Sequence, residues 1–184
     1  MILEIVKYGD PVLRAKGALV PEVTDEIKKL ASDMLETMRA ANGVGLAAQQ
    51  VGKAIQMTVI DVVNVDDRPS AMFVNGEQVA LTEHMPMVIL NPELKLAQEQ
   101  ETASEGCLSF PEITAEITRA SGVRCKGRLL DGRDIEFEAA GLLSRALQHE
   151  VDHLNGVLFI DRMNSATKAG IAGKLKRLQK EARK

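Results

Sequence analysis

Near its C-terminal end the chain reads Gln148-His149-Glu150-Val151-Asp152-His153, a run of the form H-E-x-x-H. On an α-helix, residues i and i+4 lie one turn apart on the same face, so both imidazoles would point to one spot. Two neutral imidazoles bind a transition metal, and the glutamate beside them can accept a proton from water at that metal. Two of the three histidines of the chain stand here. A metal site is therefore favoured over a solvated helix face with incidental histidines.

The flanking residues predict that this run lies on a buried helix. Leu142, Leu143, Ala146 and Leu147 fall at helical spacing, and Gly156 follows where a helix would stop. The pattern indicates a helix of about four turns with an apolar face turned to the core.

A catalytic metal needs a third protein ligand and an open position. The long zinc-protease pattern would place a third histidine where this chain has Phe159, so that pattern fails. His84 stands alone in a polar loop, where a histidine is usually solvated. Cys107 follows Gly106, which lets the backbone approach a ligand, and a thiolate binds zinc or iron well. Taken alone, Cys107 could equally be a small buried hydrophobe. Cys125 lies in an alternating, strand-like run and is expected in the core.

The segment Asn42–Gly52 has two glycines around Val44, followed by small residues. Such a segment can lay exposed backbone groups along a ligand, as an edge strand does for a peptide. It is not a dinucleotide fingerprint, because the third glycine of G-x-G-x-x-G is replaced by Ala48 and the preceding residues predict a helix. No Gly-Lys-Ser/Thr follows, which excludes a phosphate-binding loop.

Three stretches together resemble, in order, the three signature motifs of the peptide deformylase family. They are Gly43-Val44-Gly45-Leu46-Ala47-Ala48-Gln49-Gln50, Glu105-Gly106-Cys107-Leu108-Ser109 and His149-Glu150-Val151-Asp152-His153. The resemblance extends from Ile5 to about Asp161. Gln49 is a departure from the family pattern, which commonly has proline at this position. The loop therefore lacks the stiffness that a proline would give it.

The resemblance implies a hydrolase that removes the N-formyl group from the N-terminal formyl-methionine of nascent bacterial polypeptides and releases formate. It implies that Cys107, His149 and His153 hold one divalent metal ion. Ferrous iron is expected in the cell, whereas zinc, nickel or cobalt also suits these ligands in the purified protein.

The resemblance also implies the roles of the surrounding groups. Glu150 is expected to be the general base, with the Gln50 side-chain amide and the Leu108 backbone N–H as oxyanion donors. Glu105 and Ser109 are possible supports of these groups. The expected substrate-binding residues are Gly43, Val44, Gly45, Leu142, Arg145 (through its alkyl stem) and Ala146, together with the ring of His149.

Two other functions fit parts of the sequence. A zinc endopeptidase is weakened by the missing downstream ligand and by the motif around Cys107. An RNA- or ribosome-binding protein with a structural metal would need four protein ligands and no open position. Here three convincing ligands stand beside a spare Glu150.

The amino-acid composition restricts the class of protein to which the chain can belong. At 184 residues, with 45% hydrophobic and 27% charged residues, the chain suits one globular domain. Aromatic residues make up 3% and tryptophan is absent, which argues against a stacking platform for single-stranded nucleic acid. Two distant cysteines do not suggest a disulfide framework. No signal-peptide pattern or long apolar run is present, so we expect a cytoplasmic protein without membrane or DNA partners.

The overall pattern predicts an α+β fold, with mostly antiparallel sheets around a central metal-binding helix and a further C-terminal helix. We expect a helix over Thr24–Ala41 with Thr24 as its N-cap. The other expected elements are strands at Met57–Val63 and Val88–Leu90, a hairpin of Val123–Leu130 with Arg133–Ala139 around Asp131-Gly132, and a surface loop at Asp66–Gly76.

The last twenty residues differ from the rest in charge. They hold seven Lys or Arg and one Glu, a net charge of +6; because the chain carries −3, residues 1–164 carry −9. We expect residues 1–164 to form the catalytic part and residues 165–184 a basic helix of the same domain. Ile171, Leu175 and Leu178 would pack that helix on the body, while its basic residues could contact ribosomal RNA.

Overall fold

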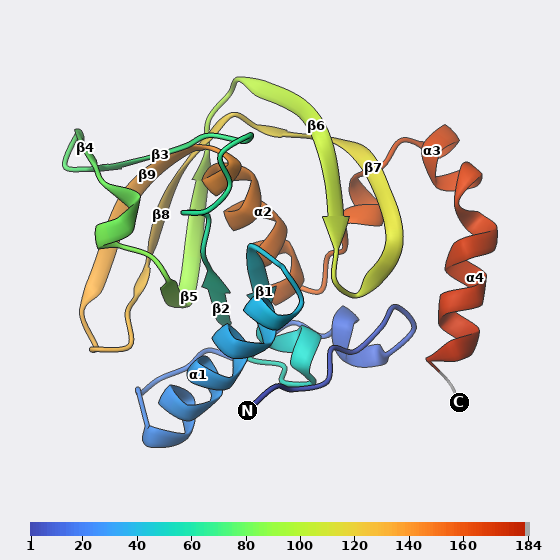
Figure 1. Cartoon of the computed structure of the whole chain (residues 1–184), viewed down its shortest axis with the longest axis horizontal. Helices are drawn as coiled ribbons and strands as arrows, with labels where there is room; N and C mark the ends of the chain where they lie inside the picture. The colour runs from blue at the N-terminus through green and yellow to red at the C-terminus, as the bar shows by residue number, and fades with distance from the viewer. Residues whose placement is uncertain (183–184) are drawn as a thin grey trace.

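Helix α2 (Leu142–Leu154) lies at the centre of the fold, and the other elements are arranged around it (Figure 1). The structure is a computed structural model that describes residues 1–182. A seven-stranded sheet lies on one side of α2, and a separate two-stranded hairpin lies on the other. All strand pairs in both sheets are antiparallel, so the expected α+β class is confirmed.

The large sheet has the strand order β1-β2-β5-β8-β9-β3-β4. Its strands are β1 (Gly45–Ala47), β2 (Met57–Ile60), β3 (Ser70–Val74), β4 (Glu77–Val79), β5 (Met87–Leu96), β8 (Gly122–Arg128) and β9 (Asp134–Gly141). The hairpin consists of β6 (Gln100–Cys107) and β7 (Phe110–Ala120). Short 3₁₀ turns η1 (Pro11–Arg14), η2 (Ala48–Val51), η3 (Leu81–Glu83) and η4 (Phe159–Arg162) connect these elements.

Two local predictions are confirmed. Helix α1 (Asp25–Ala40) begins after Thr24, whose hydroxyl accepts a hydrogen bond from the Ile27 N–H. Strands β8 and β9 form the expected hairpin around the Asp131-Gly132 turn. Strand β2 ends earlier than predicted, at Ile60, and β5 is longer than Val88–Leu90.

One prediction is wrong. The expected surface loop Asp66–Gly76 contains strand β3, which pairs with β4 and with β9. The side chain of Met72 in β3 is fully buried, and only the sheet partner explains why a mostly polar segment is extended. Strands β6 and β7 were not predicted either: β6 is polar almost throughout, and the alternation of Ile113, Ala115 and Ile117 with polar residues in β7 was overlooked.

Helix α2 starts abruptly at the end of β9. Gly141 has φ +66°, and a Cβ at this position would lie 2.1 Å from the Pro69 carbonyl oxygen, so only glycine permits this turn. The Ser70 hydroxyl accepts a hydrogen bond from the Leu143 N–H and satisfies a donor in the first turn. The start of the helix is thus fixed by strand β3.

The core lies in three clusters around α2. One packs the sheet against Leu143 and Leu147 of α2, and a second packs α1 on β1 and β2. The third joins the β6–β7 hairpin to Leu175 and Leu178 of the C-terminal helix α4 (Ala172–Glu181), which follows the short α3 (Ser165–Gly170). These two leucines are buried, as expected from their spacing. Arg183 and Lys184, counted in the basic tail, lie outside the described residues.

Candidate metal centre

The three predicted metal ligands come together from two elements. Cys107 ends β6, and His149 and His153 stand one turn apart on α2. One ligand atom of each residue lies within 4.8 Å of the other two, and Cys107 Sγ is 3.3 Å from His153 Nε2. Ligand atoms bound tetrahedrally to one zinc ion stand roughly 3.3–3.8 Å apart, so this spacing fits a shared ion. His84, at the end of η3, is not part of this cluster.

The polar groups around the ligands also fit a metal. His149 Nδ1 lies 2.9 Å from Glu105 Oε1, which holds the ring and leaves Nε2 free for an ion. Among the described residues, His153 Nδ1 and Glu150 Oε2 are buried without a hydrogen-bond partner. Such orphaned groups cost about 1–3 kcal/mol each unless something pairs with them. The Glu150 oxygen is expected to be unpaired where a site is completed by an ion, water or substrate, whereas His153 Nδ1 is the ring nitrogen directed away from the Cys107 sulfur.

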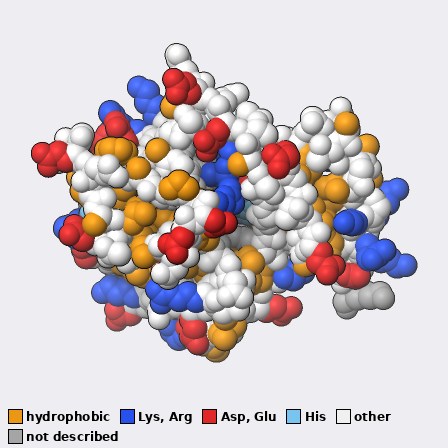
Figure 2. Space-filling view, turned by 45° about the horizontal axis from the view of Figure 1, so that its top comes forward, with side chains coloured by type: hydrophobic (Ala, Val, Ile, Leu, Met, Phe, Trp, Pro, Cys, Tyr) orange, Lys and Arg blue, Asp and Glu red, His pale blue; other side chains and the backbone are white. Residues whose placement is uncertain are grey.

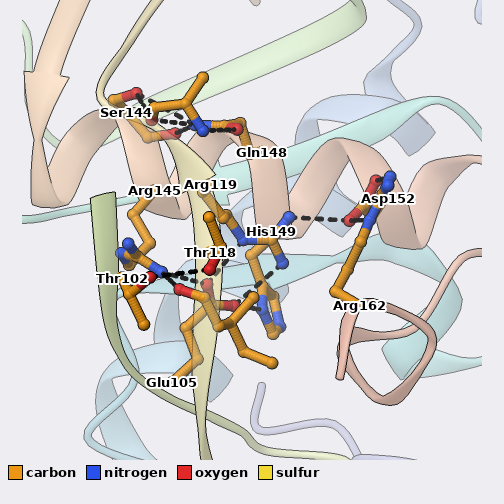
Figure 3. A network of polar contacts seen from close by, with 12 residues as sticks. Thr102, Glu105, Thr118, Arg119, Ser144, Arg145, Gln148, His149, Asp152 and Arg162 are labelled. Atoms are coloured by element: carbon orange, nitrogen blue, oxygen red, sulfur yellow. Dashed lines mark hydrogen bonds and ion pairs between the residues drawn. The ribbon is translucent and has the colours of Figure 1, made fainter. Parts of the chain in front are cut away.

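Glu105 is held by a buried ion-pair network, shown in Figure 3. Arg119 donates to its two oxygens from Nε at 2.6 Å and from Nη2 at 2.9 Å, and Arg145 Nη1 donates at 2.8 Å. Burial works to raise the pKa of Glu105, but hydrogen bonds from His149 and Arg119 outweigh it and lower this pKa to about 2. Glu105 therefore stays ionised and fixes the orientation of His149.

The network continues along α2 to Asp152, three residues after His149. Arg119 Nη1 donates to Asp152 at 2.9 Å, and Arg162 donates to the same carboxylate at 2.8 Å. Sequence reasoning had placed Asp152 in a motif without a partner and had missed Arg119 completely. The one available signal is that Arg119 continues the alternating series Ile113, Ala115 and Ile117, which is the buried face of β7.

Burial also sets the protonation of the groups facing the centre. It raises the pKa of Glu150 to about 7, and the nearby charges of His149 and Arg119 oppose this only in part. Burial, with the charges of His149 and Arg119, lowers the pKa of His153 well below its ordinary value. For His149, burial works to lower the pKa, but hydrogen bonds with Cys107 and Glu105 raise it well above its ordinary value. A neutral imidazole is the form that binds metal, so an ion that binds here must displace a proton from His149. A carboxyl group with a pKa near neutrality is suited to accept and return a proton.

Gln50 points its side-chain amide at the centre from η2. Its Oε1 accepts from the Ala47 N–H at 2.9 Å, and its Nε2 lies 3.3 Å from Ser109 Oγ and 3.6 Å from Cys107 Sγ. Leu108 lies in the tight turn between β6 and β7, and its carbonyl accepts from Lys7 Nζ at 3.0 Å. None of the described hydrogen bonds uses the Leu108 N–H as donor.

The predicted substrate-binding residues line one cavity of about 550 Å³ beside the centre. Figure 2 shows a face of the molecule that is hollowed near its middle, with basic side chains in the hollow and acidic ones around it. The cavity walls include Gly43, Val44, Gly45, Gln50, Cys107, Leu108, Leu142, Arg145, Ala146, His149 and Glu150. Lys7 and Arg68, at the same wall, were missed because isolated basic residues in the sequence usually mark solvated surface.

Steric contact shapes the cavity wall at Gly45, and hydrogen bonding shapes the wall at Arg145. A Cβ on Gly45 would lie 2.5 Å from Glu150 Oε1, so strand β1 can approach α2 only with glycine here. β1 is the last strand of its sheet and pairs on one side only, with β2. Arg145 is almost fully buried, and its guanidinium is directed to Glu105 and to the Ile117 carbonyl, so only its stem remains for the cavity.

The sequence model of the polypeptide deformylase family matches residues 2–169 of this chain. The chain belongs to the polypeptide deformylase family. It is 44% identical to the peptide deformylase of Methylacidiphilum infernorum over 98% of this chain and 94% of that protein. It resembles the solved peptide deformylase of Thermus thermophilus with a TM-score of 0.83 at 34% identity, covering 98% of this chain and 99% of that one. It also resembles the solved peptide deformylase of Thermotoga maritima, with a TM-score of 0.74 at 39% identity, covering 89% of this chain and 99% of that one.

Membership of the polypeptide deformylase family confirms the function that the three motifs predict. The chain is a metal-dependent hydrolase that removes the formyl group from nascent formylated polypeptides. Neither the endopeptidase nor the RNA-binding alternative gains support. Among residues 1–182, no helix has the length and apolar composition needed to cross a membrane.

Proposed function

We propose that Cys107, His149 and His153 hold the metal ion, and that this ion is ferrous iron in the cell. One thiolate and two imidazoles form a borderline-soft ligand set, which also accepts zinc, nickel or cobalt. The observation that carries this proposal is the convergence of the three ligand atoms within 4.8 Å, beside the buried and unpaired Glu150 Oε2. Three protein ligands leave a position open for chemistry.

Substrate binding would use the free edge of β1. An extended peptide can add to such an edge through backbone hydrogen bonds, with Gly43, Val44 and Gly45 along it. The methionine side chain would then lie against Leu142, Ala146 and the stem of Arg145. This placement brings the formyl group to the end of the cavity where Glu150 and Gln50 meet.

Catalysis would depend on three groups of the chain. When bound, the metal ion polarises the formyl carbonyl and makes hydroxide available near neutral pH. Glu150 accepts a proton from the attacking water and delivers it to the leaving amine. Gln50 Nε2 and the Leu108 N–H donate to the oxyanion that develops on the former carbonyl oxygen. Because Glu150 has a pKa of about 7, it can serve first as base and then as acid.

The test is to measure the metal content of anaerobically purified protein together with formate release from formyl-Met-Ala-Ser. We expect one metal ion per chain and one formate per peptide, without internal cleavage. Internal cleavage would instead indicate an endopeptidase. Tightly held zinc without formate release would indicate a structural site.

A second proposal concerns where the enzyme meets its substrate. We propose that α4 docks weakly on ribosomal RNA. Lys174, Lys176, Arg177 and Lys180 are exposed on this helix, and among the described residues none of them pairs with a carboxylate. The right side of Figure 2 shows basic side chains on the outer surface of the C-terminal helices. An acidic body would be repelled by RNA, so docking would have to use this basic surface.

The docking proposal predicts ribosome binding that fades between low and moderate salt, because phosphate contacts release counterions. Deleting the tail would expose the core beneath Leu175 and Leu178, so charge reversal is the cleaner change. Lys176→Glu with Lys180→Glu should abolish binding and leave turnover of a short peptide unchanged. The control reverses two exposed lysines elsewhere, Lys53 and Lys95. Equal loss in both double variants would contradict docking through α4.

A further inference from the structure

Gln49 is fully buried, and its side chain is directed to the end of the helix that carries the metal ligands. Its Nε2 lies 3.2 Å from the Leu154 carbonyl oxygen and 3.4 Å from that of Ala15. Leu154 directly follows His153, and Gln49 directly precedes Gln50. The side chain of Gln49 therefore connects the turn that presents Gln50 to the end of α2 that presents His153.

The Leu154 carbonyl is a point where three parts of the chain meet. It also accepts from the Gly17 N–H at 2.8 Å and from Gln56 Nε2 at 2.9 Å. The last carbonyls of a helix lack partners within the helix, so these donors satisfy and anchor the C-terminal end of α2. Of the three donors, only Gln49 belongs to the same turn as Gln50.

Stability alone does not favour glutamine at position 49. Its Oε1 is buried and has no hydrogen-bond partner among residues 1–182, which costs free energy that an apolar side chain of similar length would not. A proline at this position would stiffen the turn by fixing φ. Here hydrogen bonds to the end of α2 supply the restraint. Local costs of this kind are expected where position matters more than stability.

We propose that Gln49 is a positioning residue that holds the Gln50 amide in register with His153. The inference rests on the proposed role of Gln50 as an oxyanion donor. That donor acts on charge that develops only in the transition state, so a displaced amide lowers kcat and leaves KM nearly unchanged.

A double-mutant cycle of Gln49→Met and Gln50→Ala tests this coupling, with kcat and KM measured for formyl-Met-Ala-Ser. A full ångström of displacement can cost about 10²-fold, so we expect Gln49→Met to lower kcat about 3- to 30-fold. KM should stay within about twofold. In the Gln50→Ala background, Gln49→Met should change kcat by less than about twofold, because coupled residues are not additive. Gln56→Met, which removes a donor to the same carbonyl, is the matched control and should keep kcat within about twofold.

Multiplicative effects in the cycle would overturn the proposal, and so would an equal loss of kcat in Gln56→Met. Gln49→Asn keeps the amide on a shorter stem and serves if the methionine variant does not fold. The same loss of kcat is expected there, and full activity would count against the proposal. A wild-type protein that releases no formate would instead refute the proposed function, so the two failures are distinguishable.

Discussion

The orientation of His149 depends on a single charged neighbour. Glu105 is buried and accepts hydrogen bonds from Arg119, Arg145 and His149. These contacts favour its anionic form and lower its pKa to about 2 against the effect of burial. Groups that orient a ligating histidine typically contribute 10–100-fold to metal affinity, so about that loss follows when they are removed. The ion-pair network thus belongs to the metal site as much as the ligands do.

Replacing Glu105 by Gln should therefore weaken metal binding about 10- to 100-fold, as measured by competition with a chelator. The amide turns a donor toward the arginines and leaves one positive charge unpaired. Glu101→Gln is the control, because Glu101 is half exposed and lies 3.8 Å from Arg145. Equal affinity in both variants would show that Glu105 does not orient His149.

Cys107→Ser should lose most of the bound metal, because a hydroxyl is a much poorer ligand than a thiolate. Metal content and the visible spectrum of the cobalt form are the measurements. Cys125→Ala is the control and should bind metal normally, since burial raises the pKa of this thiol to about 12 and it lies in the core as predicted. An unchanged cobalt spectrum in Cys107→Ser would assign the third ligand to another residue.

At the scale of single residues, the sequence predicted those features of the site that depend only on residues close together in the chain. His149 and His153 stand one turn apart on α2, so their spacing alone implies their shared face, and Glu150 lies beside it. Arg119 could not be predicted, because it becomes a partner of Glu105 only when β7 folds against β6 and α2.

At the scale of elements, the site depends on how closely β1 approaches α2. Gly45 lies against the Glu150 carboxylate, and a Cβ would come within 2.5 Å of Oε1 and 2.9 Å of Cδ. Neither the strand nor the helix can move away freely, because both are buried. A Cβ at position 45 would therefore displace the Glu150 side chain.

Gly45→Ala should lower kcat/KM by about 10²-fold by displacing Glu150 or the bound peptide. Gly173→Ala on α4 is the matched control, since nothing lies within 4 Å of its position, and it should be as active as wild type. Wild-type kinetics in Gly45→Ala would mean that the site tolerates a wider gap between β1 and α2.

Elements with a clear period or cap were predictable, as α1 with its Thr24 cap and the β8–β9 hairpin show. Strands β3, β6 and β7 were not predicted. Strand β3 lies among polar and turn-forming residues, and its extended form depends on β9, which is distant in the sequence. Strand β7 does alternate apolar and polar residues, with Ile113, Ala115 and Ile117 on its buried face, and this signal was missed.

At the scale of the whole molecule, the C-terminal helix has two faces with different uses. Leu175 and Leu178 close the cluster that contains Phe110 at the start of β7, while the lysines remain exposed. The helical spacing of Ile171, Leu175 and Leu178 predicted an apolar and a basic face, but it could not show on which other elements the apolar face packs. Packing on the β6–β7 hairpin explains why this helix contributes to the stability of the fold.

Leu178→Ala should lower the free energy of unfolding by roughly 2–5 kcal/mol, toward the lower end because the leucine lies near the surface. Urea unfolding followed by circular dichroism measures it. Lys176→Ala, exposed on the same helix, should change it by less than about 0.5 kcal/mol. Equal stability of the two variants would show that the helix does not depend on this packing.

In the proposed mechanism the buried Glu150 moves the proton during a metal-dependent deformylation. The most direct test compares formate release by wild type and by Glu150→Gln at equal metal content. The glutamine keeps the shape but cannot accept the proton, so we expect an unchanged metal content and a rate lower by roughly 10²–10⁴-fold. A Glu150→Gln rate within a few-fold of wild type would contradict it.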